Sequence, residues 1–187
     1  LDNLPFRLFV FDGSWMEAFV SQTAGGQFVE VLRTPDEIPS CLPLTAPLGS
    51  RAPIQDAAAS WVRDCLSKID HGRLLLFDYC SASTAEIALT PWREWLRTYR
   101  AQGRGTHYLT DPGSQDITTQ VMLDQLPSGC TTSTQADFLN LWGINELVHE
   151  GTAYWESMKT APDVAALKMR SRSAEASLLK SDLGMAN

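Results

Sequence analysis

Two aspartates are the residues best placed to do chemistry. Asp78 lies at the end of an apolar run, and ligands of open α/β sheets bind beyond the carboxyl ends of the strands. A carboxylate there can orient an amine or a guanidinium. Asp116 follows an Asp-Pro-Gly turn at 111–113, and with Thr118 it would form one wall of a pocket beside Asp78. The alternatives are structural: Asp78 caps the turn at 81–84, and Asp-Pro-Gly only sets the direction of the chain.

A second polar group lies on the segment that precedes this turn. In an extended strand Arg97 and Arg100 point to opposite faces and cannot form one clamp, whereas Arg100 and Gln102 share a face. Gln102 can form hydrogen bonds with a substrate but cannot act as a base near neutral pH. The alternative is a set of ordinary polar residues on an edge strand. The predicted substrate-binding residues are Tyr79, Arg100, Gln102 and Thr118.

The elements that position these side chains suggest an α/β fold. Short β-branched and aromatic runs separated by glycine turns predict an antiparallel ribbon with strands at 7–11, 15–20 and 28–32. Five prolines make 34–53 an expected surface loop. Apolar residues spaced by three and four predict a helix over 55–69. The nearly continuous apolar run 73–79 predicts a strand that is buried on both faces.

The last third of the sequence is predicted to be helical. Helices are expected at 134–141, after a Ser/Thr-rich turn that supplies N-cap hydroxyls, and at 145–158 and 162–179. Length and composition indicate one domain over 1–187.

Charge and composition exclude several classes of binding function. A net charge of −7 argues against binding of nucleic acid or of an anionic membrane. No apolar stretch approaches the roughly 18–20 residues that span a bilayer. The four cysteines have no metal-ligand spacing, so we predict no metal site and reduced thiols in a cytoplasmic protein, or a mitochondrial one in a eukaryote. The oligomeric state is left open.

Four sequence runs together resemble one family. They are LDNLPFRLFVFDGSW at 1–15, RLLLFDYC at 73–80, LRTYRAQGRGTHYLTDPGSQDITTQVMLDQL at 96–126 and STQADFLNLWGI at 133–144. Their order resembles the C-terminal part of the MidA-like S-adenosylmethionine-dependent methyltransferases, a family that includes a mitochondrial assembly factor for respiratory complex I. The most specific family motif is matched by Asp111, Pro112, Gly113, Asp116 and Thr118.

The resemblance implies a chain that is truncated at both ends. It begins in the middle of the family pattern, so the upstream half with the main cofactor site is expected to be missing. The segment 171–184 resembles the last family helix, after which members continue into a short strand. The fold is then a partial Rossmann-like methyltransferase core with an antiparallel β excursion and C-terminal helices, and the isolated chain is expected to be inactive.

The resemblance also implies roles for the first residues. The segment 2–5 resembles the loop that lies between cofactor and acceptor in many methyltransferases. Asp2 is then expected to be catalytic together with Asp78 and Asp116, and the cofactor is S-adenosylmethionine. The predicted cofactor-binding residues are Asn3, Leu4 and Pro5. Carboxylates pair with a guanidinium bidentately, so an arginine side chain of a protein is the expected methyl acceptor.

Three positions depart from the family pattern. Cys80 replaces a glycine, while Gln102 and Gln120 stand where members often have histidine. The loss of both imidazoles leaves an alternative open: a binding or assembly protein of the same fold without catalysis.

Overall fold

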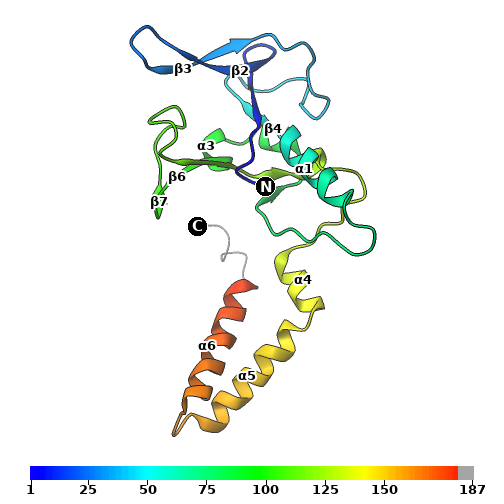
Figure 1. Ribbon diagram of the computed structural model, residues 1–187, viewed down its shortest axis with the longest axis vertical. Helices are drawn as coiled ribbons and strands as arrows, with labels where there is room; N and C mark the ends of the chain where they lie inside the picture. The colour runs from blue at the N-terminus through cyan, green and yellow to red at the C-terminus, as the bar shows by residue number, and fades with distance from the viewer. Residues whose placement is uncertain (181–187) are drawn as a thin grey trace. The chain divides into compact units, whose positions relative to one another are not determined.

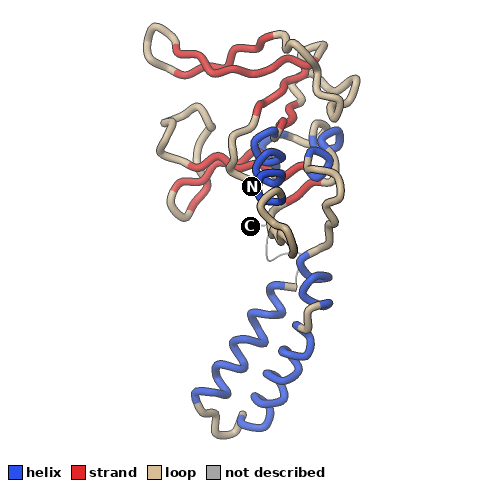
Figure 2. The backbone as a smooth tube through the Cα atoms, turned by 45° about the vertical axis from the view of Figure 1, so that its right-hand side comes forward, coloured by secondary structure: helices blue, strands red, loops and turns tan. Residues whose placement is uncertain are grey.

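The computed structural model describes residues 1–180 and divides into two compact units, one over residues 1–130 and one that begins at Thr131 (Figure 1). The first unit is a mixture of short strands and helices, and the second is helical (Figure 2). The described chain is therefore α/β, as predicted. None of the helices within residues 1–180 is both long and apolar enough to pass through a membrane.

The first unit opens with the predicted antiparallel ribbon, extended by one strand. Its order is β3-β2-β1-β4, with all neighbours antiparallel. The tight turn between β2 and β3 uses Gly26, whose φ of 82° favours glycine. The strands are β1 (Arg7–Phe11), β2 (Trp15–Gln22), β3 (Phe28–Arg33) and β4 (Arg51–Ile54).

Strand β4 corrects the prediction of a loop over the whole of 34–53. Arg51–Ile54 pairs with β1, and Pro53 lies opposite Leu8. Proline donates no backbone hydrogen bond, but β4 forms one edge of the sheet, where a missing donor is tolerated. The strand is buried because Phe9 and Phe11 of β1 pack with Ala52 and Ile54 in the first core cluster.

The helix predicted over 55–69 forms and is shorter. Helix α1 (Asp56–Leu66) buries Ala58, Ala59 and Val62 on one face. The other predicted apolar positions remain open, since Trp61 is 40% and Leu66 is 42% exposed.

The strand predicted over 73–79 is wrong for the chain as described. Leu75 and Leu76 are 54% and 39% exposed, and no described strand pairs with this run. Pairing begins only at β5 (Cys80–Ser81), which lies parallel to β9 (Val121–Met122). An apolar run becomes a buried strand only where neighbours on both sides complete the ladder, and here the described residues provide too little of it.

A three-stranded antiparallel sheet, of order β7-β6-β8, carries several predicted site residues. Trp95 and Leu96 at its start pack with Leu8 and Met122 in the second core cluster. The remaining elements of the first unit are α2 (Thr84–Ile87), α3 (Trp92–Trp95), β6 (Leu96–Arg100), β7 (Gly103–Arg104), β8 (Asp116–Thr119) and the 3-10 helix η1 (Leu123–Gln125).

The three predicted C-terminal helices are confirmed and form the second unit. They are α4 (Gln135–Leu141), α5 (Ile144–Met158) and α6 (Val164–Leu179). Side chains of Thr134 and Asp163 cap α4 and α6, and Gly143 at φ 89° separates α4 from α5. Helices α5 and α6 lie side by side in both views (Figures 1 and 2). The end of the family-like helix at 171–184, and the short strand expected after it, lie outside the described residues.

Candidate functional site

Hydrogen bonds bring the first residues of the chain together with Asp78 and the end of β8. The Asp78 carboxylate accepts hydrogen bonds at Oδ2 from the N-terminal ammonium of Leu1, with which it forms an ion pair, and from the backbone N–H of Asp2 at 3.3 Å. Its Oδ1 accepts from the backbone N–H of Tyr79 at 2.8 Å. The backbone N–H of Thr119 donates to the carbonyl of Asp2 at 2.8 Å. We call Asp2, Asp78 and Thr119 the acidic corner.

Within the acidic corner the two carboxylates have different surroundings. The Asp78 side chain is 11% exposed, and backbone nitrogens occupy both of its oxygens. It therefore holds the segment that carries Asp2. The Asp2 side chain is 32% exposed, so it is the carboxylate that a ligand can reach. This arrangement suits an acceptor whose N–H groups need a negative partner.

The structure keeps Asp116 apart from the acidic corner. Asp116 lies three residues before Thr119 on β8, which places their Cα atoms about 10 Å apart along an extended strand. It is exposed and lies opposite Tyr99 of β6, while Thr118 lies opposite Arg97. Asp116 and Thr118 alternate with Ile117, which packs against the second core cluster, so the predicted shared face is present.

The predicted pairing of Arg100 and Gln102 on one strand face is wrong. Strand β6 ends at Arg100, and Gln102 lies in the hairpin turn before β7, next to Ala101 at φ 52°. A residue in the left-handed region reverses the chain and ends the strand alternation. The Arg100 guanidinium instead forms an exposed ion pair with Asp111 at 3.4 Å.

The remaining predicted residues lie around the acidic corner. Tyr79 is 42% exposed, and its carbonyl accepts from the backbone N–H of Val121 at 2.7 Å. The backbone N–H of Leu4 donates to the carbonyl of Leu1 at 3.0 Å, which closes a turn with Asn3 and Pro5 exposed on it. Residues 1–180 contain no group of three or more side chains placed to hold a metal ion.

A buried polar network behind the acidic corner was not predicted. Gln55 is 4% exposed, and its Nε2 donates to Thr119 Oγ1 at 2.7 Å and to the carbonyl of Gln120 at 2.9 Å. Its Oε1 accepts from the backbone N–H of Met122 at 2.7 Å. Gln125 continues the network. One sequence signal was available: Gln55 opens a helix whose next turns are apolar, which is an unusual place for a surface amide.

A second unpredicted cluster joins β3, β4 and the loop after β7. Arg51 donates from Nη1 and Nη2 to the Glu30 carboxylate at 2.6 and 2.7 Å, and the Tyr108 hydroxyl donates to Glu30 Oε1 at 2.6 Å. Burial raises the pKa of Glu30, but the hydrogen bonds from Arg51 and Tyr108 outweigh it and hold that pKa below its ordinary value. Burial and the bond to Glu30 raise the pKa of Tyr108.

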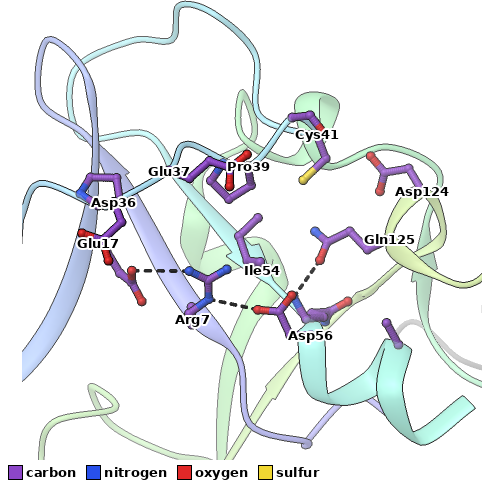
Figure 3. A pocket seen from close by; sticks show the side chains of 14 residues that line it. Arg7, Glu17, Asp36, Glu37, Pro39, Cys41, Ile54, Asp56, Asp124 and Gln125 are labelled. Atoms are coloured by element: carbon purple, nitrogen blue, oxygen red, sulfur yellow. Dashed lines mark hydrogen bonds and ion pairs between the residues drawn. The ribbon is translucent and has the colours of Figure 1, made fainter. Parts of the chain in front are cut away.

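One pocket, with a volume of about 530 Å³, has an acidic lining (Figure 3), and a second, smaller one is described below. Arg7 forms ion pairs with Glu17 at 3.5 Å and Asp56 at 3.0 Å. Asp36 and Glu37 on the opposite loop form no ion pair with any residue in 1–180. The carboxylates thus outnumber the one arginine, and the pocket favours positively charged groups.

Comparisons with known proteins place the chain in one family. Residues 1–141 match the model of a family described as "Putative S-adenosyl-L-methionine-dependent methyltransferase". Among curated proteins, none matches. A solved structure described as a superfamily member and "likely methyl transferase" from Burkholderia thailandensis, bound to S-adenosyl-homocysteine, is similar over 100% of this chain and 49% of its own, with 22% identity and a TM-score of 0.74.

A second solved structure, an uncharacterized protein of the same superfamily from Burkholderia thailandensis, covers 98% of this chain and 50% of its own, at 23% identity and a TM-score of 0.76. At this identity the two structures establish a shared fold. The chain spans about half the length of each. The family match covers most of the chain, and the chain therefore belongs to the S-adenosyl-L-methionine-dependent methyltransferase family that this model describes.

Proposed function

We propose that this chain is the acceptor-side part of a methyltransferase that uses S-adenosylmethionine. The family match and the relative bound to S-adenosyl-homocysteine support the reaction and the cofactor. The chain spans about half of that relative, and the resemblance assigns the main cofactor site to an upstream half. Under this proposal the chain contributes the surface that meets the methyl acceptor and one edge of the cofactor, and the Rossmann-like core is completed only with the upstream half.

The observation that carries the proposal is the acidic corner. Three segments far apart in the sequence, the loop at 1–5, Asp78 and the end of β8, are joined there by hydrogen bonds. The loop at 1–5 is the one that the resemblance places between cofactor and acceptor. Its backbone is held by hydrogen bonds to Asp78 and Thr119, which fixes the place from which the Asp2 side chain extends. A fixed position is what an in-line displacement requires of the protein.

We propose an arginine side chain of a protein as the acceptor. Bound S-adenosylmethionine supplies the methyl group on a sulfonium. Asp2 would pair with the guanidinium and accept the proton that its nitrogen loses as the new nitrogen–carbon bond forms and the sulfur–carbon bond breaks. Asp78 would act by positioning Asp2, and Asp116, about 10 Å along β8, would bind a more distant part of the substrate. The acidic pocket beside α1 adds to the attraction for a basic protein.

The proposed function is tested by calorimetric titration of S-adenosylmethionine. The titration is made into this chain and into a protein in which the chain is joined to the upstream half of the family. We expect binding to the longer protein and none to the chain alone. Binding to neither would overturn the proposal.

The roles of the two aspartates are then separated in the longer protein. Asp2→Asn removes the reachable carboxylate and keeps its shape, so methyl transfer to an arginine-containing peptide should fall by about 100-fold. The affinity for S-adenosylmethionine should be unchanged. Asp64→Asn, at an exposed carboxylate of α1 that lines neither pocket, is the matched control, and it should keep the rate within about threefold. An unaltered rate in Asp2→Asn would remove Asp2 from the chemistry.

A second candidate function, binding or assembly without catalysis, is favoured by the second unit. Its helices expose large apolar side chains: Leu141, Trp142, Leu147, Val164 and Leu178 are between 58% and 81% exposed. Exposed apolar helix faces are suited to partner binding. Gln102 and Gln120 stand where members of the family often have histidine, and the loss of both imidazoles also favours a function without catalysis. A longer protein that binds no S-adenosylmethionine would make it the leading one.

A further inference from the structure

The smaller pocket, of about 310 Å³, is bordered by arginines in a chain that is acidic overall. Arg93 comes from α3, Arg97 from β6 and Arg104 from β7. None of the three forms an ion pair with a residue in the described part of the chain. Arg97 donates only from Nε to the carbonyl of Glu94, at 3.0 Å. Three positive charges thus lie at one small cavity without a counter-charge.

The aromatic wall of this pocket is fixed by contacts outside it. The Trp92 ring lies 5.2 Å from the guanidinium carbon of Arg51 and 4.4 Å from that of Arg93. Arg51 is itself held by Glu30 in two hydrogen bonds, and the Tyr108 hydroxyl bonds to the same carboxylate. The charge of Arg51 is therefore neutralised, and its role is to hold Trp92 and Tyr108 in place.

The loop that forms the other side is fixed by one amide side chain. Gln115 Oε1 accepts from the backbone N–H of Thr106 at 3.0 Å. Its Nε2 donates to the carbonyls of His107 and Thr110, both at 2.9 Å. Three hydrogen bonds to one side chain link the two ends of this loop and support the shape of the pocket without a ligand.

From these observations we propose that this pocket binds the phosphate group of a small phosphate monoester. Each guanidinium presents a planar fork that bonds oxyanions bidentately, and one arginine suffices for a carboxylate. Three arginines match the greater charge and the three free oxygens of a phosphate monoester. The volume is at the lower end of the range for small-molecule sites. The net charge of −7 repels a long polyanion, which favours a small ligand over a nucleic acid.

The site is tested by titrating phenyl phosphate into the full 187-residue chain at fixed ionic strength. The reporter is the indole N–H signal of Trp92 in nitrogen–proton NMR spectra, assigned by its loss in Trp92→Phe. We expect a saturable shift. Arg97→Gln and Arg104→Gln should each weaken binding about tenfold, because each removes one charge-assisted pair. The matched control is Arg63→Gln, an exposed arginine of α1 outside the pocket, which should leave the affinity unchanged.

Three results would overturn the proposal. The absence of saturation in the wild-type chain would do so, and so would an equal loss in Arg63→Gln, because either would mean that phosphate is attracted only by the general positive charge of the surface. The third is equal affinity for phenyl phosphate and benzoate, because a site built for a dianion must discriminate against a single charge. The titration involves neither S-adenosylmethionine nor Asp2, so its outcome is independent of the proposed function.

Discussion

Gln55 is the side chain whose replacement is expected to change stability most. It is 4% exposed and makes three side-chain hydrogen bonds, to Thr119, Gln120 and Met122, at 2.7 to 2.9 Å. Gln55→Leu keeps about the same volume, admits no water and removes all three. Two of the groups left behind, the Thr119 hydroxyl and the backbone N–H of Met122, take part in buried bonds. Each unsatisfied buried group costs about 1–3 kcal/mol.

We therefore expect Gln55→Leu to lower the free energy of unfolding of residues 1–130 by about 2–6 kcal/mol. The assay is urea unfolding followed by NMR signals of β1, which report on this unit by itself. The matched control is Gln102→Leu in the exposed hairpin turn, which should change the unfolding free energy by less than about 0.5 kcal/mol. Equal changes in the unfolding free energy for the two substitutions would refute the reasoning. They would mean that the buried hydrogen bonds of Gln55 add no stability beyond the general effect of replacing glutamine by leucine.

Three further perturbations follow from single contacts. A Cβ at Gly105 would lie 2.5 Å from Gln115 Oε1, so Gly105→Ala should displace the Gln115 side chain. We expect the melting temperature to fall by several degrees in thermal unfolding, and phenyl phosphate to bind more weakly. Asp78→Ala should release the loop at 1–5 and speed hydrogen exchange of the Thr119 amide, which donates to Asp2, by at least tenfold. The pKa of Glu30 is lowered in the folded protein. Its ion pair with Arg51 therefore stabilises the fold fully at pH values above the unfolded pKa of about 4.5, and this stabilisation is lost as the pH falls below 4.5 through the lower pKa of the folded state. Glu30→Gln should remove this part of the acid sensitivity in urea unfolding at several pH values.

Sequence patterns predicted the elements whose hydrogen bonds and turns are made by residues close together in the sequence. The β1–β3 ribbon followed from alternation and from Gly26, which permits the positive φ of the turn. The helix α1 followed from apolar periodicity, and α4 followed from the Ser/Thr-rich turn that supplies its N-cap, Thr134. Strand β4 did not, because its signal is tertiary: a proline-containing segment becomes a strand only where an edge of β1 is free to receive it.

The candidate sites divide in the same way. The sequence resemblance led to Asp2 and Asp78, and the structure shows them joined by a backbone hydrogen bond. Strand alternation also placed Arg100 and Gln102 on one face, but β6 ends at Arg100 and Gln102 lies in the turn that follows. The arginine pocket escaped prediction because Arg93 and Arg104 are eleven positions apart and become neighbours only when the β6–β7 hairpin folds back towards α3. Contacts of this kind depend on the pairing register of the β6 and β7 strands, which the residue types alone do not determine.

The run at 73–79 shows what an apolar pattern does and does not specify. Consecutive leucines indicate a strand that is covered on both faces, but they do not provide the elements that cover it. In this chain Leu75 and Leu76 are 54% and 39% exposed, and pairing starts only at Cys80. The solved relatives are about twice as long as this chain. A neighbouring strand would bury these side chains, but the described residues place none beside them, so the apolar pattern alone does not make 73–79 a buried strand.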